Sequence, residues 1–117
     1  MTPAPLVVLV DDLRSFTDGR PALVARTSAD AIALLTRIAG QPIAELWLDH
    51  DLGGIDTIWP VVEVLERAAF EEAPIPVGTV FVHSANPAGA ARVALALRRW
   101  GYRVELVPGS PVVGYLG

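Results

Sequence analysis

Apolar runs of strand length recur along this chain, and the strongest of them end in titratable residues. Residues 6–10 are followed by Asp11-Asp12, and residues 44–48 are followed by Asp49-His50-Asp51. A continuous apolar run is typical of a strand buried on both faces, as in parallel sheets covered by helices. Helical patterns separate the runs, so the sequence predicts repeated strand–helix units.

The predicted elements follow from apolar periodicity, caps and helix breakers. Strands are predicted over residues 6–10, 23–26, 44–48, 77–82 and 103–107. Helices are predicted from a cap at Thr27 or Ser28 to about Ala39, from about Asp56 to Glu71, and from Pro87, capped by Asn86, to Trp100. Residues 13–21 are expected to form a loop or one poor helical turn, and residues 108–117 show no helical period.

The predicted helices carry apolar stripes that should face a core. The expected buried side chains are Ile32, Leu35 and Ala39, then Ile58, Val61, Val62, Leu65 and Ala69, then Val93, Leu97 and Trp100. Right-handed crossovers predict a three-layer α/β fold around a five-stranded parallel sheet, in the order 2-1-3-4-5 of flavodoxin-like folds. The 117 residues fit a single domain over residues 1–117.

Composition excludes several classes of protein. The chain has no Cys, which rules out disulfides and thiolate metal sites and fits the cytoplasm, the expected location. No signal peptide or membrane-spanning run is recognised, so no membrane association is expected. The net charge of −4 argues against binding duplex DNA through its phosphates.

Polar clusters follow three of the predicted strands. Besides the two acidic clusters, the strand over residues 77–82 is followed by His83-Ser84 and by Asn86. Ligands bind at the carboxyl ends of strands in open parallel sheets, near the switch point between the first and third strands. Although each cluster alone fits a turn, capping or core role, together they predict one acidic, histidine-containing pocket.

Carboxylates that share a pocket repel each other, and a divalent cation is the ordinary remedy. The predicted metal ligands are Asp11, Asp12, Asp49 and Asp51. Oxygen ligands favour Mg²⁺ or Mn²⁺, and ligation by His50 or His83 would extend the choice to Fe²⁺ or Zn²⁺. With Arg14 and the helix start at Asn86, such a cation would make an anion site suited to phosphate.

Several segments resemble the two-component receiver domain. Val7 to Asp12 resembles its first strand and acidic pair, Leu48-Asp49 its phosphoacceptor aspartate, and Ser84-Ala85 its Ser/Thr-Ala pair. Val107-Pro108 falls where receivers carry Lys-Pro, but the 9 basic residues here are all Arg, which argues against ordinary phosphorelay signalling. Relative to receivers, the first helix is expected to be reduced to residues 13–21 and the last helix to be absent.

A closer resemblance is to the cyclic-phosphate processing receiver domain. Asp11 to Arg14 matches a DDxR pattern, residues 48–53 read LDHDLG, and residues 83–87 read HSANP. The resemblance implies a receiver fold adapted to hydrolysing cyclic phosphates of nucleotides or RNA ends, as in RNA repair. The ligand would be a small phosphorylated molecule or an RNA terminus, and the activity that of a metal-dependent phosphoesterase.

The roles expected of the site residues follow from this chemistry. The nucleophile is Asp49 or a water molecule, and His83, ahead of His50, is the expected acid–base group because histidine titrates near neutral pH. Ser84 is assigned to catalysis and, with Arg14 and Asn86, to substrate binding. Because side chains alternate along a strand, Asp49 and Asp51 are expected to share a direction while His50 faces away, unless the chain has already turned at that point. The same alternation separates His83 from Ser84.

A second function from another class stays open. The chain could be a catalytically inert receiver-like module that binds a phosphorylated ligand or a protein partner, or that forms an oligomer. The additional histidines beside the key positions favour the enzyme.

Overall fold

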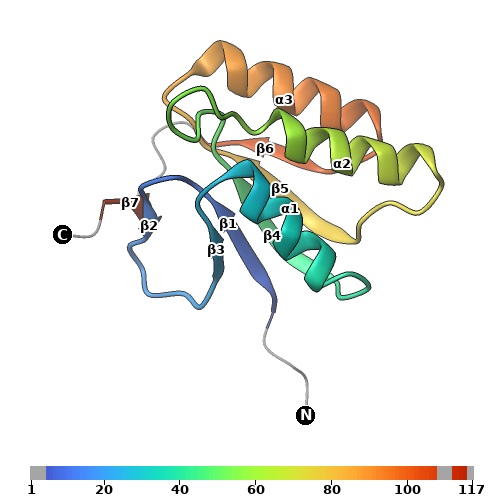
Figure 1. The fold of residues 1–117 in the computed structure, drawn as a ribbon, viewed down its shortest axis with the longest axis horizontal. Coiled ribbons are helices and arrows are strands. Elements are labelled where there is room, and N and C mark those ends of the chain that lie inside the picture. The colour runs from blue at the N-terminus through green and yellow to red at the C-terminus, as the bar shows by residue number, and fades with distance from the viewer. Residues whose placement is uncertain (1–4, 108–111, 116–117) are drawn as a thin grey trace.

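The structure is a computed structural model that describes residues 5–107 and 112–115. Its elements are β1 Val7–Val10, β2 Ser15–Phe16, β3 Leu23–Ala25, α1 Ser28–Arg37, β4 Ile43–Leu48, α2 Trp59–Phe70, β5 Val77–Val82, α3 Pro87–Arg99, β6 Val104–Leu106 and β7 Val113–Gly114 (Figure 1). Five strands form a parallel sheet in the order β3-β1-β4-β5-β6, which confirms the predicted flavodoxin-like order. The remaining pair, β2 and β7, forms a short antiparallel ribbon.

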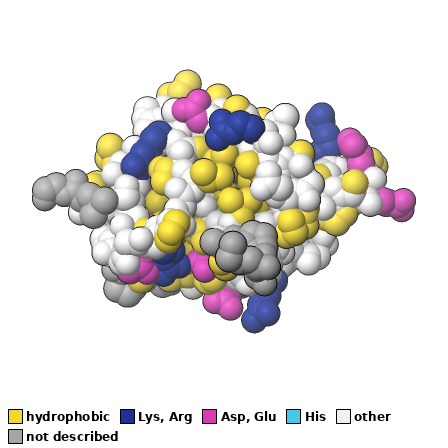
Figure 2. All heavy atoms as spheres, turned by 90° about the horizontal axis from the view of Figure 1, so that it is seen from below, with side chains coloured by type: hydrophobic (Ala, Val, Ile, Leu, Met, Phe, Trp, Pro, Cys, Tyr) yellow, Lys and Arg dark blue, Asp and Glu magenta, His cyan; other side chains and the backbone are white. Residues whose placement is uncertain are grey.

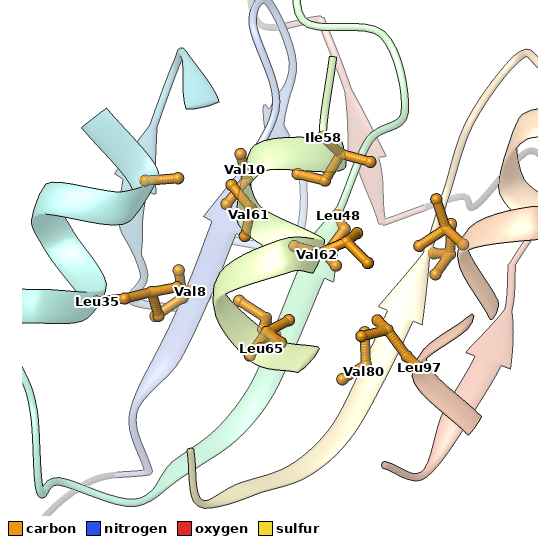
Figure 3. Close-up of a cluster of buried hydrophobic side chains, with 14 of the residues drawn as sticks. Val8, Val10, Leu35, Leu48, Ile58, Val61, Val62, Leu65, Val80 and Leu97 are labelled. Carbon is orange, nitrogen blue, oxygen red and sulfur yellow. The ribbon is translucent and has the colours of Figure 1, made fainter. Parts of the chain in front are cut away.

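All three helices cover the same face of the sheet. From β3 the chain steps to β4, β5 and β6 in one direction, so right-handed crossovers place each connecting helix on one side. Alternate strand residues, such as Val8, Leu48 and Val80, are fully buried in this layer. Figure 3 shows α2 lying over the middle of the strands, with Val62 and Leu65 directed into the cluster.

The β2–β7 ribbon, at the left of Figure 1, packs against the opposite face of the sheet over β1 and β4. The connection from β1 to β3 runs the other way across the sheet, so its right-handed path lies on this face. Phe16 and Val113 form a second buried cluster with Trp47 of β4. Arg20 lies 4.6 Å from the Phe16 ring centroid and 5.6 Å from that of Trp47, and it pairs with Glu45. The predicted reduction of the first helix is confirmed, and this ribbon with Arg20 covers the apolar face instead.

Three details of the helices differ from the prediction. Ala39, expected on the buried face of the first helix, is exposed, because α1 ends at Arg37 and Ala39 lies beyond its C-cap. The second helix begins at Trp59, because the backbone of residues 56–58 is hydrogen-bonded to residues 50–52, with Asp51 and Thr57 in a bridge. The Asp56 carboxylate accepts hydrogen bonds from the backbone N–H and hydroxyl of Ser28 at the start of α1. The prediction that Trp100 points inward is wrong, since its side chain is 36% exposed. The third helix ends at Arg99, and Trp100 is its C-cap, so it leaves the buried stripe.

The chain after β6 carries no helix in its described part, Val107 and residues 112–115, in agreement with the predicted loss of the last helix. Of the predicted tail, residues 108–111 and 116–117 lie outside the described residues. No helix in the described ranges combines the length and the apolar character needed to cross a membrane.

An apolar groove lies at the amino-terminal edge of the sheet. Its volume is about 460 Å³, and its lining includes Leu35, Ile43 and Ile75 but no titratable side chain. Figure 2 shows the molecule from below, with apolar side chains gathered in the middle and charged ones around them. The acids and histidines follow the strands, so they lie at the other edge of the sheet.

Candidate functional site

Three titratable side chains leave the sheet directly after neighbouring strands. The backbone N–H groups of Asp11, Asp49 and His83 still donate to carbonyl oxygens of the adjacent strands, at 3.0–3.1 Å. The residues before them face the helices and are Val10, Leu48 and Val82. Because side chains alternate along a strand, Asp11, Asp49 and His83 all point to the opposite face. The convergence predicted from the sequence is therefore present for these three.

Asp11 is fully buried, and its carboxylate accepts four hydrogen bonds. Its Oδ1 accepts from the backbone N–H of Leu13 at 3.0 Å and of Arg14 at 2.7 Å. Its Oδ2 accepts from Arg14 Nε and from His83 Nε2, both at 2.9 Å. Burial raises the pKa of Asp11, but these hydrogen bonds and the Arg14 charge together lower it to about 2. Asp11 is therefore ionised at neutral pH.

Arg14 bridges two carboxylates of the site. Its Nε lies 2.9 Å from Asp11 Oδ2, and its Nη2 lies 3.2 Å from Asp49 Oδ2. The side chain is 22% exposed, so the guanidinium lies at the surface of the cluster.

Arg26 holds the backbone of the turn that carries Arg14. Its Nη1 donates to the carbonyl oxygens of Asp11 and Arg14, and its Nη2 donates to Ser15 Oγ at 2.9 Å. Arg26 is not among the site residues expected from the sequence. It follows β3, the neighbour of β1, so the rule that functional residues gather at strand carboxyl ends could have found it.

Asp12 and Asp49 complete an acidic cluster with Asp11. One carboxylate oxygen from each lies within 4.8 Å of the others. Burial and the nearby Asp11 charge raise the pKa of Asp49, although Arg14 and His83 act to lower it. Gly53 closes over this cluster, since a Cβ there would lie 3.3 Å from Asp12 Oδ2 and its φ is +90°. These oxygens are the donor type that hard divalent cations prefer.

His83 lies behind the acidic cluster, with 1% of its surface exposed and its ring 5.9 Å from that of Trp47. Because the ionised Asp11 carboxylate can only accept, His83 Nε2 carries the proton. The other nitrogen, Nδ1, is buried and has no hydrogen-bond partner within the described part of the chain. The ring is therefore placed to hold Asp11, and its assignment to acid–base chemistry stays a prediction.

Asp51 is not among the three clustered carboxylates. Its side chain is 61% exposed, and its Oδ1 accepts a hydrogen bond from His50 Nδ1 at 3.0 Å. The chain has already turned here, because Asp51 pairs with Thr57 in an isolated antiparallel bridge. The expected shared direction of Asp49 and Asp51 is therefore not found.

His50 faces away from Asp49, as alternation predicts, and packs into the helical layer. Its ring lies edge-on to Trp59, with centroids 6.4 Å apart. The first turn of α3 approaches it so closely that a Cβ on Gly89 would lie 2.6 Å from His50 Cδ2. His50 Nε2 is buried without a hydrogen-bond partner among the residues that the structure describes.

Ser84 and Asn86 shape the start of α3. Asn86 Oδ1 accepts from the Gly89 N–H at 3.0 Å, which confirms Asn86 as the N-cap. Ser84 Oγ accepts from the Asn86 N–H at 3.0 Å. Neither bond involves the acidic cluster, so the phosphate contacts assigned to Ser84 and Asn86 remain predictions.

One comparison with known proteins bears on this site. The model of the family described as the cyclic-phosphate processing receiver domain matches residues 6–99. No curated protein matches the chain. The matched range runs from β1 through α3 and includes all residues of the acidic cluster, Arg14 and His83.

Proposed function

We propose that this chain, which belongs to the cyclic-phosphate processing receiver domain family, is a divalent-metal-dependent phosphoesterase for cyclic phosphates of nucleotides or RNA ends. The observation that carries the proposal is the Arg14 guanidinium between Asp11 and Asp49, beside the Asp12 carboxylate. One site thus combines an anion-binding cation with oxygen donors. Metal-assisted reactions of phosphate esters use both kinds of group.

The donor set fits Mg²⁺ or Mn²⁺. Asp11, Asp12 and Asp49 offer hard oxygen ligands whose nearest atoms lie within 4.8 Å of one another. Asp51, the fourth ligand expected from the sequence, lies outside this group. A divalent cation bound here would neutralise phosphate charge during the reaction.

The proposed reaction breaks one P–O bond of the ring. Water or Asp49 attacks phosphorus, the bond to the 2′ or 3′ oxygen breaks, and that oxygen takes a proton. If Asp49 attacks first, water then cleaves the Asp49–phosphorus bond, and both routes leave a phosphate monoester. Arg14 would hold a non-bridging phosphate oxygen, because the planar guanidinium matches phosphate geometry.

The role proposed for His83 is to position Asp11. Its Nε2–H orients the Asp11 carboxylate and helps to keep it ionised. Direct proton transfer to the substrate would require the ring to reach it, whereas the side chain is 1% exposed. We therefore favour a positioning role for His83 over the acid–base role expected from the sequence.

Turnover of 2′,3′-cyclic nucleotides and of RNA with a cyclic-phosphate end, in Mg²⁺ or Mn²⁺, tests the proposal. The wild type should open the ring, and Asp49→Asn should slow the reaction by at least about 10²-fold. Asp51→Asn has the same charge change outside the cluster and should keep most of the activity. No turnover by the wild type with either metal would refute the enzyme, and turnover that survives Asp49→Asn would refute this site.

A phosphate-binding module without turnover is the second candidate, and the burial of both histidines favours it. His50 is 6% and His83 is 1% exposed, so neither presents an open imidazole to a ligand. Calorimetry with a 2′,3′-cyclic nucleotide separates the candidates. Saturable binding that leaves the ring intact after prolonged incubation with metal would identify the module.

A further inference from the structure

Asp11 has no vacant acceptor position in this structure. Its two oxygens accept four hydrogen bonds, from Leu13, from Arg14 twice, and from His83. A carboxylate offers about four lone-pair positions. A cation that binds Asp11 directly must therefore replace one of these donors.

Arg14 Nε is the donor that can leave most readily. The backbone N–H groups of Leu13 and Arg14 belong to a turn that Arg26 holds. His83 is 1% exposed, and moving its Nε2 away from Asp11 would leave a buried polar group without a partner. The Arg14 side chain is 22% exposed, so its guanidinium can reach water by rotating its own side chain while the backbone stays in place.

The contact of Asp49 also favours the Arg14 guanidinium as the group that a metal ion displaces. Its Oδ2 lies 3.2 Å from Arg14 Nη2, so the guanidinium partly neutralises both carboxylates at once. A divalent cation among the acids would take over this neutralisation and repel the guanidinium. Since the chain has no Lys, only Arg can supply the charge of an extended cationic side chain.

We infer that Arg14 is an internal counter-cation that a divalent metal displaces, and that the released guanidinium then anchors a phosphate oxygen. This inference rests on the proposed function and adds an order of binding to it, metal first and phosphate second. Metal and phosphate binding are therefore coupled, and each raises the affinity for the other.

Calorimetry on the whole chain tests metal displacement and phosphate binding separately. One substitution, Arg14→Gln, should change the two affinities in opposite directions. Arg14→Gln should bind Mg²⁺ and Mn²⁺ about three- to tenfold more tightly than the wild type, because a competing ion pair is removed. With Mg²⁺ present, the same variant should bind inorganic phosphate at least about tenfold more weakly, because a charged hydrogen bond to the anion is lost. Arg37→Gln removes the same charge from the exposed last turn of α1 and should match the wild type in both titrations.

A second measurement needs no variant and decides the question if Arg14→Gln fails to fold. In ¹⁵N-labelled wild type without metal, the Arg14 Nε–H should be protected from exchange by its hydrogen bond to Asp11. Saturating Mg²⁺ should make this proton exchange with water at least about tenfold faster, since the bond is broken. The Leu13 amide should keep its protection, because Arg26 holds that turn.

The outcomes distinguish failure of Arg14 displacement from failure of the proposed metal-dependent function. If the wild type binds metal, while Arg14→Gln binds it equally or less tightly or the Arg14 Nε–H stays protected, displacement is wrong and metal-dependent function stands. If neither protein binds either metal at millimolar concentration, the metal-dependent function fails and displacement fails with it. Binding by Arg14→Gln but not by the wild type would also overturn displacement, because Arg14 would then occupy the metal position and exclude the ion.

Discussion

His83 Nε2 donates a hydrogen bond to Asp11 Oδ2 at 2.9 Å, although 72 residues separate the two in the chain. The bond joins the ends of β1 and β5, between which β4 lies in the sheet. Both side chains are buried, so each provides the other with a partner that water cannot supply. The hydrogen bond between Asp11 and His83 therefore contributes to the stability of the fold as well as to the site.

His83→Ala should destabilise the protein by about 1–3 kcal/mol, because it leaves the buried Asp11 carboxylate short of a donor. His83→Gln should recover part of this loss, since its amide can donate where the imidazole did. Urea unfolding at neutral pH measures both free energies of unfolding. A positioning role also predicts that His83→Gln keeps more activity than His83→Ala, whereas equal loss of activity in the two would point to proton transfer by His83.

Acid should destabilise the wild type partly through Asp11. Its pKa falls from the ordinary 3.8 to about 2 on folding, so the unfolded chain takes up this proton first. The stability is present above about pH 4 and is lost as the pH falls towards about 2, to a total of about 2 kcal/mol.

The difference between the wild type and Asp11→Asn in unfolding experiments from pH 6 to pH 2 isolates this contribution. Asp49 has the opposite sign, because its pKa is raised and the folded chain takes up its proton first. Asp49→Asn should therefore make acid destabilisation steeper. Identical pH profiles for the wild type and Asp11→Asn would show that folding does not lower the pKa of Asp11.

Gly89→Ala should destabilise the protein, although Ala ordinarily favours a helix over Gly by about 1 kcal/mol. The added Cβ would lie 2.6–2.9 Å from three atoms of the His50 ring, so either the ring or α3 must move. A cost of about 1–3 kcal/mol is expected for such overpacking. The double variant His50→Ala with Gly89→Ala has room for the methyl group, and thermal unfolding should show that its loss is smaller than the sum of the single losses.

Asp12 and Asp51 provide a matched test of the metal ligands. Asp12→Asn should weaken Mn²⁺ binding by at least about tenfold, because it removes a charged ligand from the cluster. Asp51→Asn should stay within about twofold of the wild type, because its carboxylate is exposed and pairs with His50. Isothermal titration of both variants decides whether Asp51 belongs to the ligands. If both substitutions weaken Mn²⁺ binding equally, Asp51 is a ligand together with the clustered carboxylates.

Several parts of the site could be predicted because they depend on local signals. Asp11, Asp49 and His83 each end an apolar run, and parallel strands bring such ends to one edge. Asn86 was recognisable as an N-cap because Pro87 follows it. For Asp51 the sequence left two alternatives open, a direction shared with Asp49 or an early turn, because alternation holds only while the chain continues as a strand. The structure shows the turn.

The β2–β7 ribbon also could not be predicted from the sequence. Each of its strands has 2 residues, too short for a period-2 pattern, and the two lie at opposite ends of the chain. Trp100 was misplaced for a related reason: its spacing continues the stripe of Val93 and Leu97, but the helix ends one residue earlier.

By itself, the sequence determined the fold class, the strand order and the gathering of Asp11, Asp49 and His83 at the carboxyl edge of the sheet. These follow from apolar periodicity, capping and crossover handedness, which act locally or hold for all chains of L-residues. Only the tertiary structure decided which donor meets which oxygen: Arg14 between Asp11 and Asp49, His83 on Asp11, and His50 beneath Gly89. The physical reason is that a hydrogen bond or a close contact depends on ångström-scale distances between side chains from different strands and helices, and no spacing along one chain encodes those distances.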